Sequence, residues 1–387
     1  MSLKDEFTKA IQAAEELTAR KRMWTPGVEW LGTEGTVTTD AVSGDPEWDS
    51  ILRAWDLDPA EYQIIEPVLF NSWGGPDGLT NRQFKAKVIR RVHSTVDLEP
   101  LIAQAMRHKP KKRTFEGDST FNVVLADWQI GKADGDGLEG TIARIIDRRE
   151  AVIERARELR KIGRDVAHLN VLWTGDSVEG CMGFYPSQTF SVELDRRDQV
   201  KITRRLLTDS LQAWARHFET ITVVAVAGNH GENRGTGKAF TGAHDNDDLA
   251  IVEQVSEILA ANEDAYGHVR FVIARDNLTV TVPSAGWILG ITHGHVTRHG
   301  ANAEGKLRSW WEKQAAGKQP IGDADILVSG HYHHFRVADW GGCLWMQAPA
   351  LDGGSEYWRV LTGEVSEPGM LTFVTSTSQR VCDIAVL

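Results

Sequence analysis

Carboxylate, amide and imidazole side chains occur in five short groups along this chain, each directly after an apolar run that is expected to form a strand. The groups are Asp127-Trp128-Gln129, Gly175-Asp176-Ser177-Val178-Glu179, Gly228-Asn229-His230, His293-Gly294-His295 and Gly330-His331-Tyr332-His333. Nine of the thirteen histidines lie between residues 230 and 334. These mixed oxygen and nitrogen donors suit borderline-hard divalent ions such as Mn, Fe or Zn better than a thiolate site would.

The number of candidate ligands sets the expected number of ions. The seven candidates are Asp127, Gln129, Asp176, Asn229, His293, His331 and His333. Seven donors exceed the needs of one ion, but they fit two ions about 3.5–4 Å apart that share a bridging carboxylate. We therefore expect two divalent cofactor ions, Mn first, with Fe, Zn or Mg as alternatives. The competing interpretation is that these polar residues only cap helices and form turns.

The elements around the five groups alternate between strand and helix. Apolar runs predict strands at 121–126, 168–174, 221–227, 287–292 and 325–329, and periodic segments predict helices at 139–162, 192–218, 247–261 and 302–316. In a parallel sheet, the carboxyl ends of the strands meet at one edge, where ligands bind. We expect an α/β catalytic domain over residues 116–387 that brings the five groups together.

Residues 1–115 form a different kind of region. Their pattern predicts a helix over 3–22, a short helix near 46–55 and strands over 66–72 and 83–92, and so a small α+β accessory module. Residues 82–113 hold ten Lys or Arg against two acidic residues, and they include a basic linker. This segment is either a solvated face or a nucleic-acid contact. The region as a whole is a candidate surface for a protein partner or for a second copy of the chain.

The five groups in this order resemble the motifs of the calcineurin-like metallophosphoesterase superfamily: DxH, GDxxD, GNH, a lone His and GHxH. The resemblance covers residues 120–387 and is nearest to the DNA-repair exonuclease-like branch. It implies a four-layer α/β/β/α sandwich around two metal ions. It also implies that the first ion is held by Asp127, Asp176 and His333, and the second by Asp176, Asn229, His293 and His331.

The same resemblance assigns roles to residues beside the metals. It makes His230 the catalytic histidine, which would protonate the leaving oxygen after a metal-bridging hydroxide attacks phosphorus. Glu179 would orient His230. In the loop that follows His230, Arg234 and Lys238 are candidate substrate contacts, as is His295.

Three positions depart from the family pattern. Gln129 stands where the pattern has histidine, and an amide oxygen is a weaker donor than imidazole, so we expect a loosely held first metal. Glu179 replaces an aspartate but keeps a carboxylate. Gly180 stands where the Ser/Thr protein phosphatases carry a phosphate-binding arginine, which argues against that class.

The leading functional hypothesis is a metal-dependent phosphodiesterase or nuclease, with nucleic acid as substrate. The alternatives are a small-molecule or nucleotide phosphatase, a cyclic-nucleotide phosphodiesterase, or an inactive binding scaffold. The net charge of −11 over 387 residues argues against non-specific coating of duplex DNA. The three cysteines are widely spaced and no long apolar run occurs, so we expect a cytoplasmic protein that neither spans membranes nor depends on disulfides.

Overall fold

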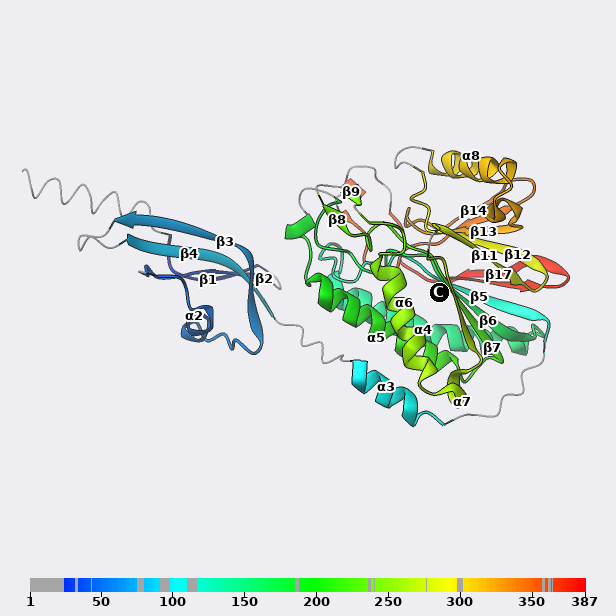
Figure 1. Ribbon diagram of the computed structural model, residues 1–387, viewed down its shortest axis with the longest axis horizontal. Helices are drawn as coiled ribbons and strands as arrows, with labels where there is room; N and C mark the ends of the chain where they lie inside the picture. Colours follow the sequence, from blue (N-terminus) through cyan, green and yellow to red (C-terminus); the bar gives the residue numbers. More distant parts are fainter. Residues whose placement is uncertain are drawn as a thin grey trace, which may run out of the picture. The chain divides into compact units, whose positions relative to one another are not determined.

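The computed structural model describes residues 24–31, 34–42, 44–74, 80–90, 98–109, 117–184, 188–235, 238–239, 241–275, 277–297, 302–356, 359–360, 363 and 365–387. The chain forms two compact units, Met1–His93 and Ser94–Leu387 (Figure 1). The predicted helix over 3–22 lies outside the described residues. None of the helices in the described ranges has the length and apolar character needed to cross a membrane.

The first unit is a small antiparallel sheet with one helix. Its strands β1 (Gly27–Leu31), β2 (Glu34–Thr38), β3 (Tyr62–Gly74) and β4 (Thr80–Arg90) lie in the order β1-β2-β4-β3, and α2 spans Trp48–Ala54. The core is formed by Val37, Leu52, Leu57 and Val88. The predicted strands over 66–72 and 83–92 fall within or overlap β3 and β4, whereas β1 and β2 were not predicted.

A six-stranded sheet forms the first layer of β-structure in the second unit. Four of its strands run parallel: β5 (Ser119–Leu125), β6 (Val166–Trp173), β7 (Thr220–Ala225) and β10 (Val269–Ile273). The other two, β16 (Leu371–Ser376) and β17 (Gln379–Val386), pair antiparallel. The strand order is β10-β7-β6-β5-β16-β17. The connecting helices are α4 (Gly137–Lys161), α5 (Arg196–Trp214) and α6 (Asp247–Ala260), with the short α7 (Glu263–Tyr266) after α6. Asp195 and Asn246 cap α5 and α6, because their side chains accept backbone N–H groups of the first turn.

The second sheet has five strands. It is formed by β11 (Thr279–Ser284), β12 (Trp287–Thr292), β13 (Ile326–Ser329), β14 (Arg336–Asp339) and β15 (Leu344–Gln347) in the order β11-β12-β13-β15-β14. Strands β12, β13 and β15 are parallel, and both edge strands are antiparallel. The helix α8 (Ala303–Ala316) and the 3₁₀ turn Pro320–Asp323 precede β13.

Alternating side chains divide the core of the second unit into layers. In β5, Phe121, Val123 and Leu125 pack toward α4, α5 and α6, while Val124 packs toward the second sheet. The outer face of the second sheet, with Leu327 and Trp345, packs against Leu307 of α8 and Ile321. Helices therefore flank two stacked sheets (Figure 1), and the α/β class predicted from the sequence is confirmed.

The boundary between the two units differs from the predicted one at 115/116. Helix α3 (Leu98–Arg107) belongs to the second unit, because Leu101 and Ala105 are fully buried in the core that includes α5 and α6. Asn262 donates hydrogen bonds to the carbonyls of Ala105 and His108 at 2.9 and 3.0 Å. The basic composition of this segment concealed an amphipathic helix, and the structure places the division at 93/94.

Candidate metal centre

The predicted ligands sit in strained turns at the strand ends. Ten described non-glycine residues have positive φ, and five are predicted ligands: Asp127 (50°), Gln129 (41°), Asp176 (53°), His331 (72°) and His333 (59°). Left-handed conformations cost energy for residues with a Cβ, and they cluster where function holds them in place. The turns after β5, β6 and β13 are therefore shaped for their side chains.

Glycine lets these turns approach one another closely. A Cβ on Gly228 would lie 2.2 Å from both the backbone nitrogen and Oδ1 of Asp176, and one on Gly330 would lie 2.5 Å from Oδ2 of Asp127. Asp248, in the first turn of α6, accepts the backbone N–H groups of Asp176 (3.0 Å), Ser177 (2.8 Å) and Gly228 (2.9 Å). The turns after β6 and β7 are thereby tied together.

Three predicted ligands converge at this edge. The ligand atoms of Asp176, His293 and His331 all lie within 4.8 Å of one another, and this is the only such group of His, Cys, Asp or Glu in the described part of the chain. Nε2 of His293 lies 2.9 Å from Oδ2 of Asp176 and 3.1 Å from Nδ1 of His331. Both Asp176 and His293 are buried. The cluster has the donor types and the spacing of a metal site.

Two further observations fit a metal ion at this cluster. Nδ1 of His293 lies 2.8 Å from the carbonyl of Thr174 and donates there, so Nε2 is the nitrogen that faces the cluster and would bind the metal after losing its proton, as in ligating histidines. The side-chain oxygen of Asn229 is buried and has no hydrogen-bond partner among the described residues. Its neighbour His230 donates its backbone N–H to Oδ1 of Asp176 at 2.7 Å. A buried acceptor without a donor is costly, and a cation would satisfy it.

The electrostatics of the cluster show how closely its charges are coupled. Burial would lower the pKa of His293, but the Asp176 carboxylate outweighs burial and raises this pKa to about 9. Burial would raise the pKa of Asp176, yet the charges of His293 and His230 hold it well below its ordinary value. Burial and then His293 lower the pKa of His295 to about 3. The metal-free site thus holds Asp176 as a carboxylate and a proton on His293 that a metal must displace.

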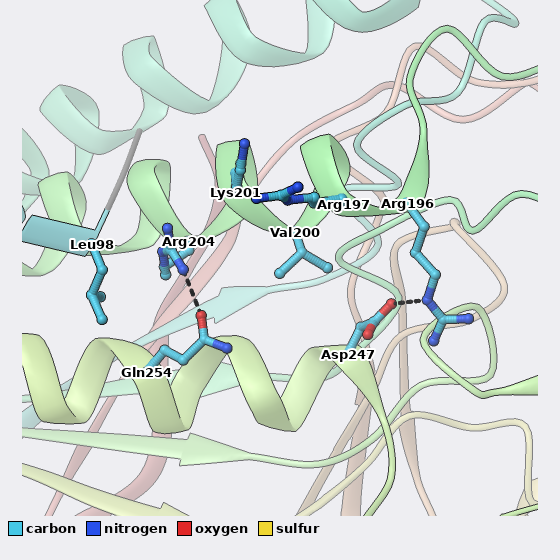
Figure 2. Close-up of a pocket in the computed structure, with 8 residues that line it drawn as sticks. All are labelled: Leu98, Arg196, Arg197, Val200, Lys201, Arg204, Asp247 and Gln254. Atoms are coloured by element: carbon cyan, nitrogen blue, oxygen red, sulfur yellow. Dashed lines mark hydrogen bonds and ion pairs between the residues drawn. The ribbon is translucent and has the colours of Figure 1, made fainter. Parts of the chain in front are cut away.

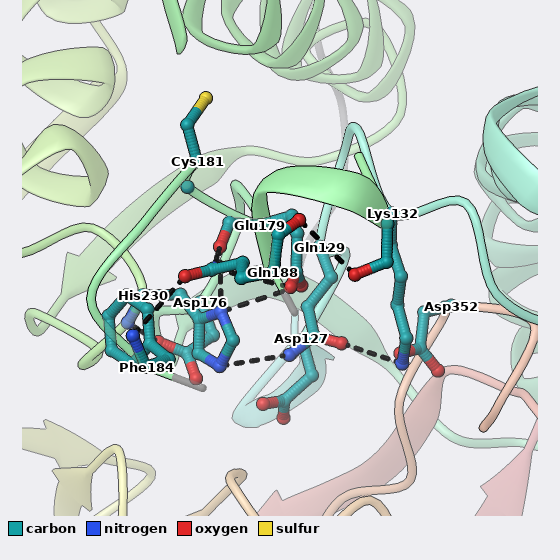
Figure 3. A network of polar contacts seen from close by, with 12 residues as sticks. Asp127, Gln129, Lys132, Asp176, Glu179, Cys181, Phe184, Gln188, His230 and Asp352 are labelled. Carbon is teal, nitrogen blue, oxygen red and sulfur yellow. Dashed lines mark hydrogen bonds and ion pairs between the residues drawn. The ribbon is translucent and has the colours of Figure 1, made fainter. Parts of the chain in front are cut away.

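His230 lies beside this cluster in a fixed orientation. Its Nδ1 is 2.8 Å from the carbonyl of Glu179 and 3.4 Å from Oε2 of the same residue. The backbone carbonyl of Glu179 is therefore the nearer orienting group, with the predicted carboxylate as a second contact. Nδ1 donates to Glu179, so Nε2 points toward the site, where it meets Nε2 of Gln129 at 3.5 Å (Figure 3).

A stack of three side chains holds the ring of His230. Phe184 lies parallel to it, with ring centroids 4.2 Å apart and an interplanar angle of 1°. The guanidinium carbon of Arg234 lies 4.1 Å from the centroid of the Phe184 ring. Gln188 accepts the backbone N–H of Phe184 at 3.2 Å and donates to the carbonyl of Glu179 at 2.9 Å. Phe184 and Gln188 were not predicted, because neither belongs to a motif.

Gln129, expected as a ligand of the first metal, contacts Lys132 and His230. Its side-chain oxygen accepts a hydrogen bond from Nζ of Lys132 at 3.0 Å, and its nitrogen faces His230. Lys132 also forms an ion pair with Asp352 (Figure 3), and their side chains are 12% and 1% exposed. Among the described contacts, Gln129 thus connects a buried lysine to His230. Its oxygen has two lone pairs and accepts one hydrogen bond here, so the assignment of Gln129 as a metal ligand stays a prediction.

Asp127 and His333, the other residues expected at the first metal, belong to the same network. Nε2 of His333 lies 3.3 Å from Oδ1 of Asp127, and its Nδ1 lies 3.6 Å from Oδ2 of Asp352. Burial would lower the pKa of Lys132, but Asp352 outweighs burial and raises it. Lys132 is therefore charged at neutral pH. Sequence reasoning missed both Lys132 and Asp352 because they lie outside the motifs and 220 residues apart.

Two of the candidate substrate contacts, Arg234 and His295, lie near Glu232. Arg234 pairs with Glu232 through Nη2 at 2.7 Å, besides covering Phe184. Nε2 of His295 is 3.9 Å from Oε1 of Glu232, and its Nδ1 is buried without a hydrogen-bond partner in the described ranges. The side chain of Lys238 falls outside the described part of the structure.

A basic pocket of about 580 Å³ lies next to the loop that follows His230. Its lining includes four cationic side chains of α5, namely Arg196, Arg197, Lys201 and Arg204 (Figure 2). Arg196 pairs with Asp247 at 2.6 Å and donates to the carbonyl of Gly231 at 3.1 Å. Arg196 therefore lines the pocket and also contacts the loop that follows His230.

Comparison with solved structures finds several of low sequence identity and low TM-score. An archaeal phosphodiesterase is 12% identical over 69% of this chain and 100% of its own, with a TM-score of 0.33. A predicted phosphoesterase from Streptococcus pneumoniae is 12% identical over 70% of this chain and 98% of its own (TM-score 0.28). Vacuolar protein sorting 29 from Cryptosporidium parvum is 13% identical over 70% and 97% (TM-score 0.30).

Other comparisons give no match. No protein-family model matches the chain, and no curated protein sequence does so either. The structural similarities are to metallophosphoesterase-like folds, and none is specific to a DNA-repair exonuclease. At these TM-scores the similarities carry no argument, and the function is argued from the residues of the site.

Proposed function

We propose that this protein is a metal-dependent phosphoesterase that hydrolyses phosphodiesters. The observation that carries the proposal is the cluster of Asp176, His293 and His331 beside the unpartnered oxygen of Asn229. A divalent ion held there would activate water and neutralise charge on the phosphoryl oxygens. Mn is the first candidate, because carboxylate and amide oxygens with two imidazoles suit it.

The residues of the chain supply the proton transfer. In hydrolysis, the oxygen of water forms a bond to phosphorus, the bond from phosphorus to the leaving oxygen breaks, and that oxygen takes up a proton. Nε2 of His230 is the nearest candidate donor. Its Nδ1–H is fixed by the Glu179 carbonyl at 2.8 Å, and Oε2 of the same residue lies 3.4 Å away. Phe184 keeps this ring in one plane.

We further propose that the substrate is a nucleic acid. The basic pocket on α5 supports this proposal, because its cations lie next to the His230 loop and match a phosphate backbone that continues beyond the scissile diester. The chain as a whole is acidic, with a net charge of −11, so this group of four cationic side chains differs in charge from the rest of the protein. The proposal covers hydrolysis of nucleic-acid phosphodiesters in general and does not single out an exonuclease.

The proposal is tested with purified protein, Mn²⁺ and four substrates: single-stranded DNA, duplex DNA, bis-p-nitrophenyl phosphate and p-nitrophenyl phosphate. We expect hydrolysis of the diesters, abolished by chelator and restored by Mn²⁺. Preference for the monoester would instead indicate a small-molecule phosphatase. No turnover of any substrate with metal bound would indicate a binding scaffold.

The pocket has its own test with a matched control. Replacing Arg197 and Lys201 by Ala should raise KM for single-stranded DNA and make the slope of log KM against log salt shallower by about 1–2. Hydrolysis of bis-p-nitrophenyl phosphate, which is too small to reach the pocket, should not change. Arg308→Ala, which removes an exposed pair with Glu312 on α8, serves as control. Equal effects of both changes would remove the pocket from the substrate path.

A further inference from the structure

The residues expected at the first metal and those expected at the second have different surroundings. In the half expected to hold the second metal, Asp176, His293 and His331 converge, and the side-chain oxygen of Asn229 has no hydrogen-bond partner among the described residues. In the other half, a lysine side chain is already present. Nζ of Lys132 lies 3.0 Å from the oxygen of Gln129 and pairs with Asp352.

The acidic groups of the half that contains Lys132 are linked to this lysine. Asp352 contacts Nδ1 of His333 at 3.6 Å, and Nε2 of His333 contacts Asp127 at 3.3 Å. Oδ1 and Oδ2 of Asp127 also face the backbone N–H of His331 at 3.2 and 3.0 Å. The side chains of Asp127 and Asp352 are 0% and 1% exposed. These carboxylates therefore have cationic or N–H partners without a metal ion.

We infer that the ammonium group of Lys132 takes the place of the first metal ion, so that the chain holds one divalent ion at Asp176, Asn229, His293 and His331. This inference rests on the proposed function. It proposes one ion in place of the two that were expected, and it makes Lys132 a positioning residue that holds a fixed positive charge beside Gln129 and Asp352.

The electrostatic reason is that the ammonium of Lys132 lies beside Gln129, among the groups expected at the first metal, where its charge repels a divalent ion. The ammonium also pairs with Asp352, which contacts Nδ1 of His333, a residue expected at the first metal. Gln129 contributes to the same exclusion. Histidine at this position would offer a strong nitrogen donor, whereas the oxygen of Gln129 accepts from Lys132 and its nitrogen turns to His230 (Figure 3).

The test is metal stoichiometry, which does not depend on turnover. The full-length protein and its variants are loaded with excess Mn²⁺, desalted and measured by elemental analysis, with circular dichroism to confirm folding. We expect one ion per wild-type chain. The double variant Gln129→His with Lys132→Met should bind two, because it removes the ammonium and restores an imidazole donor while Asp127, His333 and Asp352 remain.

Three controls define the cause. Lys132→Arg keeps the positive charge and should bind one ion. Lys132→Met with Asp352→Asn removes both partners of the buried pair and should also bind one. Lys313→Met, at the exposed end of α8, should leave the stoichiometry unchanged.

The outcomes separate this inference from the proposed function. Two ions in the wild type, with diester hydrolysis, would overturn the inference and leave the proposed function standing. No bound ion, with no hydrolysis, would refute the proposed function itself. One ion in the wild type and still one in a folded Gln129→His, Lys132→Met variant would show that the lysine is not what excludes the second ion.

Discussion

At the scale of single residues, the proposed chemistry depends on the orientation of His230. Its Nδ1 donates a hydrogen bond to Glu179 and its ring stacks on Phe184. These two contacts fix the orientation of the ring and therefore the direction in which Nε2 points. This arrangement suits a general acid, which contributes about 10²–10⁴-fold to a rate.

His230→Ala should lose turnover and keep its metal, because the His230 side chain is not in the ligand cluster. The loss should be large for DNA, whose leaving alkoxide needs a proton. It should shrink for bis-p-nitrophenyl phosphate, whose leaving group does not. Steady-state kinetics on both substrates, with metal content measured in parallel, checks this. An equal loss on the two substrates would argue against proton donation.

Proton release on metal binding is a second prediction at the residue scale. The pKa of His293 is raised to about 9 in the metal-free protein, so this ring holds a proton at neutral pH. A metal must displace that proton, and its affinity should therefore rise with pH up to about 9 and fall as pH is lowered. Calorimetric titration of Mn²⁺ in buffers of different ionisation enthalpy counts the protons. Binding without proton release at pH 7 would contradict this account of His293.

At the scale of elements, strand ends and close-packed turns set the site. The five motif groups were predicted to meet at the edge of one parallel sheet, but β5, β6 and β7 belong to the six-stranded sheet and β12 and β13 to the five-stranded sheet. The turns after β6, β12 and β13 still meet, because Asp176, His293 and His331 converge. The turns can meet only because glycine occupies the points of contact, as at Gly228 against Asp176.

Gly228→Ala should therefore weaken metal binding more than it affects the sheet. The added Cβ would lie 2.2 Å from Asp176, against backbone that cannot move without displacing the ligand. We expect a lower melting temperature and at least about tenfold weaker Mn²⁺ binding, comparable to losses from changes around a metal site. Gly286→Ala tests a glycine in the turn between β11 and β12 with no atom within 4 Å of its Cβ. Its φ of +92° means that only stability should fall there, and equal metal affinities in the two variants would contradict the steric argument.

Much of this organisation could be predicted from sequence, and the remainder could not for a physical reason. Strands and helices of the second unit follow local apolar patterns, and the motif residues follow the strands. The Lys132–Asp352 pair and the Phe184–His230 stack depend instead on contacts between distant segments. Helix α3 was missed because its basic flanks outweighed the apolar positions Leu101 and Ala105.

At the scale of the whole molecule, the chain has two units with separate cores. Among the described residues, the first unit has one cluster of four buried apolar side chains, and the second has three larger clusters that span both sheets and their helices. Burial of apolar surface grows with domain size, so the smaller unit should be less stable. A role for the first unit in binding a partner or a second copy remains a prediction.

Two unfolding transitions should follow from this division. Calorimetry of the full chain should show a smaller transition at lower temperature, and saturating Mn²⁺ should raise only the larger, later one. The reason is that the ligand cluster lies wholly within Ser94–Leu387, and binding stabilises the unit that binds. A single transition that shifts as a whole with Mn²⁺ would mean that the two units unfold together.

The central claim is that Asp176 holds a catalytic metal ion together with His293 and His331. The most direct measurement is Mn²⁺ affinity and diester hydrolysis in the same preparations of wild type, Asp176→Asn and the control Asp383→Asn, which alters an aspartate paired with Arg164. Asp176→Asn should weaken Mn²⁺ binding by about 100-fold or more, beyond what changes around a ligand cost, and hydrolysis should be lost in step, while the control behaves as wild type. Unchanged metal binding and turnover in Asp176→Asn would contradict the account.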